Sequence, residues 1–134
     1  MQLLVNIDVS DVASATEFYC RALGLTVGRR FGAGGVELLG ASSPIYLLHK
    51  DAGSAGTSAP GTRRDYARHW TPVHVDFVVD DIHTALARAE AAGARVEQPL
   101  RTGSWGHIVV LADPFGHGFC LIQFLNRGYD EIAS

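Results

Sequence analysis

Apolar and polar side chains alternate at the start of the chain, from Leu3 to Val9. Every second residue is apolar, and Asn6 and Asp8 occupy the positions between them. A period of two is typical of a β-strand with one buried face. The pattern therefore predicts a strand that turns Asn6 and Asp8 to the face opposite its buried side chains.

The spacing then changes to that of a helix. Apolar residues recur every three or four positions up to Leu23, after Ser10 or Asp11, either of which is a suitable N-cap. Gly24 stands where a glycine commonly ends a helix. Three short apolar runs separated by Gly, Ser and Pro predict three strands, at Leu25–Phe31, Val36–Leu39 and Ile45–His49.

The second half of the chain repeats this plan. His74 to Val79 alternates, and Asp80 or Asp81 can cap a helix from Ile82 to about Ala92, which Gly93 ends. Further strands are predicted around Val96, at His107–Ala112 and at Gly118–Phe124, with a tight turn at Asp113-Pro114-Phe115-Gly116.

The segment between the halves is rich in Gly, Ser, Ala and Thr from Asp51 to Thr62, which indicates a flexible linker. Arg63 to Trp70 is expected to form a short helical turn. The halves align without a gap from the first strand into the helix, so that Val5 meets Val75 and Asp11 meets Asp81.

The predicted fold class is therefore α+β, with two βαβββ modules that form a curved mixed sheet and carry their helices on the outer face. The whole chain is expected to be a single domain. Its expected parts are a first module at 1–52, a linker at 53–72, a second module at 73–126 and a C-terminal tail at 127–134.

Composition narrows the class of protein. The 134 residues are 47% hydrophobic and carry a net charge of −3, and Arg63, Arg64 and Arg68 form the one basic cluster. This cluster is too small for a nucleic-acid backbone, and no apolar run reaches the ~20 residues that a membrane span needs. The start of the chain lacks the basic region of a signal peptide. We therefore expect a cytoplasmic protein with neither a nucleic-acid nor a membrane partner.

Three motifs in order resemble the vicinal-oxygen-chelate (glyoxalase/bleomycin-resistance) superfamily. They are Asn6-Ile7-Asp8-Val9-Ser10-Asp11 with Phe18-Tyr19 and Leu23-Gly24-Leu25, then Val73 to Asp81, then Asp113 to Leu121. The resemblance implies a small-molecule site on the concave face of the sheet and a homodimer. In metal-using members, four strand positions hold one divalent ion, and these correspond here to Leu4, Tyr46, His74 and Cys120.

The chain departs from that metal pattern. Leu4 has no donor atom, and a tyrosine is a poor ligand unless it is ionised. Only His74 and Cys120 remain, and two ligands do not hold a divalent ion of this kind. We therefore expect neither a metal nor another cofactor.

The residues expected to line a ligand pocket share the concave face or an adjacent loop. His74 and Asp76 lie two apart on one strand, and could form a hydrogen-bonded pair that serves binding, proton transfer or structure alone. Trp105, in a glycine-flanked loop, could close over a flat ligand or simply anchor the loop. The full set of candidates is Asn6, Asp8, Tyr46, His74, Asp76, Trp105 and Cys120.

These features favour a metal-independent binding protein of the bleomycin-resistance type, which holds an aromatic or amphipathic ligand. The alternatives are a glyoxalase-, epimerase- or dioxygenase-like metalloenzyme, and a metal-free enzyme that uses His74 and Asp76 for proton transfer. A further alternative is a domain that is retained only for dimerisation. Whether the protein is an enzyme stays open at this point.

Overall fold

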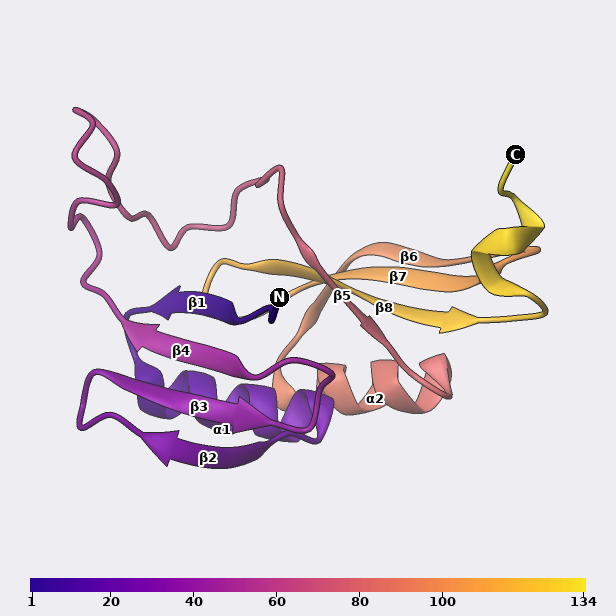
Figure 1. Ribbon diagram of the computed structural model, residues 1–134, viewed down its shortest axis with the longest axis horizontal. Helices are drawn as coiled ribbons and strands as arrows, with labels where there is room; N and C mark the ends of the chain where they lie inside the picture. Colours follow the sequence, from indigo (N-terminus) through magenta and orange to yellow (C-terminus); the bar gives the residue numbers. More distant parts are fainter. The chain divides into compact units, whose positions relative to one another are not determined.

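The computed structural model of the chain describes all 134 residues. It divides into two units, Met1–Ala67 and Arg68–Ser134, and each unit is a four-stranded mixed sheet with one α-helix (Figure 1). None of its helices has the length and apolar character that crossing a membrane requires. The α+β fold class predicted from the sequence is confirmed.

Unit 1 has the strand order β1-β4-β3-β2, in which β1 runs parallel to β4 and the other pairs are antiparallel. Its elements are β1 (Val5–Val9), α1 (Val12–Leu23), β2 (Thr26–Arg30), β3 (Gly35–Leu39) and β4 (Ile45–His49).

Unit 2 has the equivalent order β5-β8-β7-β6, again with one parallel pair, β5 with β8. Its elements are β5 (Val75–Val78), α2 (Ile82–Ala92), β6 (Arg95–Gly103), β7 (Gly106–Ala112), β8 (Gly118–Phe124) and a 3-10 turn, η1 (Gly128–Glu131).

The internal repeat extends to the helix caps and the strand register. Asp11 accepts the amide of Ser14 at 3.0 Å, and Asp81 accepts the amide of Thr84 at 2.8 Å. In the parallel pairs, Asn6 lies opposite Tyr46 and Asp76 lies opposite Cys120. The structure therefore places Asn6 and Asp76, and likewise Tyr46 and Cys120, at equivalent positions.

Each sheet has one face packed against its helix. In unit 1, Leu38 of β3 and Leu47 of β4 are fully buried, and α1 packs against both strands. In unit 2, Val109 and Leu121 are equally buried against α2. Alternate residues of the same strands point the other way, onto what we call the helix-free face of each sheet.

The expected helical turn at Arg63–Trp70 is wrong. Backbone hydrogen bonds join Arg64 to Ser54 and Gly53, and Arg63 forms an isolated β-bridge with Ala55. These pairings use the amide and carbonyl of Arg64, which a helix would have needed. The first part of the linker therefore folds back on itself in an extended conformation.

Candidate functional site

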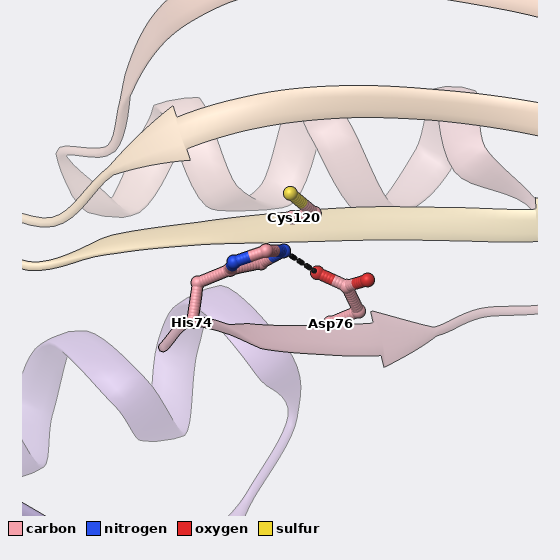
Figure 2. Close-up of side chains that lie close together, drawn as sticks. All are labelled: His74, Asp76 and Cys120. Carbon is pink, nitrogen blue, oxygen red and sulfur yellow. Dashed lines mark ion pairs between the residues drawn. The ribbon is translucent and has the colours of Figure 1, made fainter. Parts of the chain in front are cut away.

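In unit 2, β5 and β8 bring His74, Asp76 and Cys120 together (Figure 2). Nε2 of His74 lies 3.3 Å from Oδ1 of Asp76. One potential ligand atom from each of the three residues lies within 4.8 Å of the others. The predicted proximity of His74 to Asp76 on one face is therefore present, and the parallel register adds Cys120 beside them.

The thiol of Cys120 is protonated at neutral pH. Burial raises its pKa to about 12, and a hydrogen bond to Asp76 and the charge of that carboxylate act in the same direction, while Arg101 opposes them. Asp76 is thus the acceptor at the centre of the cluster, between the imidazole and the thiol. This arrangement suits polar recognition or proton transfer and does not activate the thiol as a nucleophile.

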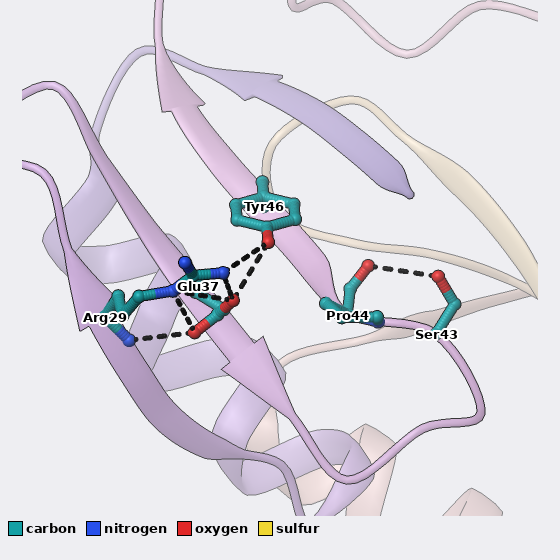
Figure 3. Close-up of polar contacts among 5 residues, drawn as sticks. All are labelled: Arg29, Glu37, Ser43, Pro44 and Tyr46. Atoms are coloured by element: carbon teal, nitrogen blue, oxygen red, sulfur yellow. Dashed lines mark hydrogen bonds and ion pairs between the residues drawn. The ribbon is translucent and has the colours of Figure 1, made fainter. Parts of the chain in front are cut away.

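In unit 1, Arg29, Glu37 and Tyr46 form a second polar cluster on the helix-free face (Figure 3). Nε of Arg29 donates to both carboxylate oxygens of Glu37, at 3.1 and 3.0 Å, and Nη2 donates to Oε1 as well. The hydroxyl of Tyr46 donates to Oε1 of Glu37 at 2.9 Å and accepts from Nη2 of Arg29 at 3.1 Å. The backbone amide of Arg29 completes the shell of the carboxylate at 3.1 Å.

These hydrogen bonds determine the protonation states of the three residues in the unit 1 cluster. Hydrogen bonds from the side chain and the amide of Arg29 lower the pKa of Glu37 to about 2. The hydrogen bond to Glu37 raises the pKa of Tyr46, so its phenol stays neutral. Glu37 raises the pKa of Arg29 in turn. Of these three residues, only Tyr46 was predicted from the sequence as a candidate site residue.

The remaining unit 1 candidates lie on β1. Asp8 accepts from Nε of Arg64 at 2.7 Å, so its carboxylate already has a partner from the segment that follows β4. Asn6 is exposed and lies opposite Tyr46 in the register. In unit 1, Asn6 therefore lies on the strand next to Tyr46, while Asp8 is engaged with Arg64.

Trp105 lies apart from the unit 2 cluster. It precedes Gly106, which pairs with the end of β8, whereas Cys120 pairs with Val110, four residues and roughly 13 Å further along β7. The indole packs against Tyr129 of η1, with ring centroids 5.2 Å apart. This is the contact of a loop anchor, which is one of the two roles that the sequence left open.

The four-ligand divalent site of metal-using relatives does not fit these residues. Leu4 offers no donor, and the phenol of Tyr46 is occupied by Glu37 and Arg29. The guanidinium also places a fixed positive charge beside that position. Unit 2 on its own provides a different set of donors, an imidazole, a carboxylate and a thiol, and Asp76 is the member that sequence reasoning did not count.

The family follows from the match of residues 4–122 to the model of the glyoxalase-like domain. The chain belongs to this family. An uncharacterized protein of Mycobacterium tuberculosis, Rv0887c, is 35% identical over 135 residues, which cover 94% of this chain and 76% of that protein. The vicinal-oxygen-chelate resemblance is thereby confirmed.

A second relative carries a functional name. The anthracycline biosynthesis protein DauV of Streptomyces sp. (strain C5) is 32% identical over 133 residues, which cover 96% of this chain and 43% of that protein. This glyoxalase-like chain thus spans less than half the length of DauV.

Solved structures with the same fold include TioX and the fosfomycin resistance protein FosX. TioX from Micromonospora sp. ML1 matches with a TM-score of 0.71 and 20% identity, covering 93% of this chain and 99% of that one. A variant of the fosfomycin resistance protein FosX from Listeria monocytogenes, in complex with Mn(II) and a dihydroxypropylphosphonic acid, matches with a TM-score of 0.73 and 17% identity, covering 99% and 97%. At these identities the likeness establishes the fold of this glyoxalase-like protein and nothing further.

Proposed function

We propose that this protein binds a planar aromatic or amphipathic small molecule on the helix-free faces of its sheets, without a divalent metal at the position used by metal-dependent relatives. One observation carries the proposal, namely the engagement of Tyr46 by Glu37 and Arg29. Because of these bonds, neither Tyr46, which stands at the metal-ligand position on β4, nor the adjacent carboxylate of Glu37 is available to a metal ion.

Electrostatics supports the same conclusion. Nη2 of Arg29 lies 3.1 Å from the phenol oxygen of Tyr46. A divalent cation bound to that oxygen would face the guanidinium at close range and would compete with it for Glu37. Binding the ion would require breaking the Arg29–Glu37 pair, whose carboxylate side chain is only 6% exposed.

The helix-free faces have the chemistry of ligand-binding surfaces, in which apolar area is combined with a few oriented polar groups. Their exposed apolar side chains are Leu4, Phe31 and Leu39 in unit 1 and Val78 and Phe124 in unit 2. The polar groups are the two clusters described above and Asn6. DauV is named for the biosynthesis of anthracyclines, which are planar polycyclic aromatic compounds, and this name supports the proposed ligand class.

The test uses untagged protein and the planar dye quinizarin, a dihydroxyanthraquinone. We expect saturable binding in equilibrium dialysis, with the same Kd after treatment with EDTA and after addition of Mn(II), and substoichiometric metal by elemental analysis. Stoichiometric Mn, Fe, Ni or Zn in the purified protein, or binding that EDTA abolishes and metal restores, would overturn the proposal.

The cluster in unit 2 favours a second candidate function, which is proton transfer or metal-assisted chemistry on the ligand. Its imidazole, carboxylate and thiol form a mixed donor set that suits zinc better than Mn(II) or Mg(II). Metal content separates the zinc version from the metal-free one. Replacement of His74 by alanine would abolish turnover in either version and leave ligand binding measurable.

We further propose that the protein acts in the cytoplasm and that it is a homodimer, which the family resemblance implies. Sedimentation equilibrium over a range of protein concentrations tests the dimer directly. A monomer at all concentrations, with quinizarin binding intact, would remove the dimer from the proposal and leave the binding function in place.

A further inference from the structure

The guanidinium of Arg29 is held rigidly on one side and is open to solvent on the other. Nε and Nη2 are bound to Glu37, and Nη2 also reaches Tyr46. No hydrogen bond within the chain uses Nη1, and the side chain of Arg29 is 69% exposed although its carboxylate partner is buried. An exposed arginine normally loses rotamer freedom when it binds a ligand, and here Glu37 has already removed most of that freedom.

Two aromatic residues, Phe31 and Tyr46, lie beside this guanidinium. The ring of Phe31 is 48% exposed, and its centroid lies 6.0 Å from Cζ of Arg29. The rings of Phe31 and Tyr46 lie 6.1 Å apart at an angle of 40°. A flat ring placed over Phe31 could therefore also meet the plane of Arg29, since guanidinium groups stack on aromatic faces.

The charge balance limits what the N–H groups of Nη1 can recognise. Glu37 is ionised at neutral pH and compensates the charge of Arg29. A strongly charged anion such as phosphate would be attracted by Arg29 but repelled by the carboxylate of Glu37. An uncharged carbonyl or phenol oxygen accepts the same N–H groups without that opposition.

We propose that Arg29 and Phe31 form a subsite for a planar aromatic ligand that carries carbonyl or hydroxyl oxygens on its edge, with Phe31 stacking on the ring and Nη1 of Arg29 donating to the oxygens. This inference rests on the proposed binding function and names the chemistry of its ligand. Glu37 is a positioning residue, since it fixes the guanidinium and does not meet the ligand.

The experiment compares two probes of similar shape. Quinizarin has the edge oxygens, and anthracene has the same fused three-ring outline with no oxygen atom. Arg29→Lys retains a cation for Glu37 and removes Nη1 with the planar group. We expect this variant to bind quinizarin about 10-fold or more weakly and to bind anthracene within about two-fold of wild type. Phe31→Ala should weaken the binding of both probes.

Arg30→Lys is the matched control, because Arg30 is the next residue on β2 and pairs with Val36 rather than with Glu37. It should bind both probes as wild type does, and thermal unfolding should confirm that all variants are folded. Inorganic phosphate should not compete with quinizarin.

The outcomes separate this inference from the function on which it rests. Failure of the wild-type protein to bind either probe overturns both. Binding of quinizarin that Arg29→Lys and Phe31→Ala leave unchanged overturns the subsite alone, and so does competition by phosphate.

Discussion

Arg64 and Asp8 are 56 residues apart in the sequence, and their side chains form an ion pair with Nε 2.7 Å from Oδ2. Only 20% of the arginine side chain and 34% of the aspartate side chain are exposed. The guanidinium of Arg64 also donates to the carbonyl of Ala55 and the hydroxyl of Ser54. One arginine therefore ties the segment that follows β4 to β1 of the same unit.

Replacing Asp8 with asparagine should loosen this segment. We expect the free energy of unfolding to fall by only about 0.5–1 kcal/mol, while cleavage by trypsin after Arg63 and Arg64 becomes several times faster. Limited proteolysis followed by mass spectrometry measures the rate. Asp80→Asn, a change at an exposed aspartate, is the control, and equal cleavage rates in both variants would contradict the tethering role of Asp8.

Glu37 should make the protein sensitive to acid. Its carboxyl has a pKa of 4.5 when unperturbed and about 2 in the fold. Because the folded value is the lower one, Glu37 stabilises the fold fully above pH 4.5, and this stabilisation is lost as the pH falls towards 2. Glu37→Gln should lower the melting temperature at neutral pH and flatten the loss of stability in acid.

Urea denaturation at a series of pH values between 7 and 2 measures this effect. Glu17→Gln serves as the control, because Glu17 is exposed and pairs only with Arg21 on the surface of α1. Parallel stability curves for wild type and Glu37→Gln would show that the carboxylate of Glu37 does not contribute as described.

Cys120 should react slowly with alkylating agents. In a Cys20→Ser background, we expect iodoacetamide to modify Cys120 only at strongly alkaline pH, because burial and Asp76 hold its pKa at about 12. Asp76→Asn removes the charge and should raise the rate at a given pH. The pH dependence of alkylation, followed by mass spectrometry of the intact protein, tests the coupling, and identical profiles with and without Asp76 would refute it.

Gly106 allows β7 to begin close to β8. A Cβ atom at this position would lie 2.3 Å from the carbonyl oxygen of Gln123 and 3.2 Å from Cα of Phe124. We expect Gly106→Ala to lower the free energy of unfolding by more than about 2 kcal/mol. Gly34→Ala should cost little, because its nearest neighbour would be 3.5 Å away. Similar melting curves for the two variants would contradict this account.

The sequence predicted regular elements best where local signals were strong. The helix α2 begins after Asp81 and ends at Ala92, as its cap and its glycine stop indicated. By contrast, only Val96 pointed to β6, which runs from Arg95 to Gly103. This strand lies at the edge of its sheet with two register shifts and is mostly exposed, so its polar composition gave no alternation to detect.

The candidate residues were harder to predict than the fold. A lone Glu37 between two buried apolar residues was the available signal for the unit 1 cluster. Its partner could not be read from the sequence, because a register shift between Val27 and Arg30 decides that Arg29 meets Glu37. The ion pair of Arg64 with Asp8 could not be predicted from the sequence either, because it depends on how the glycine-rich segment after β4 folds back on itself.

The matching registers of the two units have a consequence for the history of the chain. Tyr46 and Cys120 occupy equivalent positions in the repeat, yet their polar partners differ. They are Glu37 and Arg29 of unit 1 for Tyr46, and Asp76 of unit 2 for Cys120. After a duplication, selection could therefore alter the chemistry of one copy without a compensating mutation in the other. The two halves accordingly carry different side-chain chemistry at these equivalent positions.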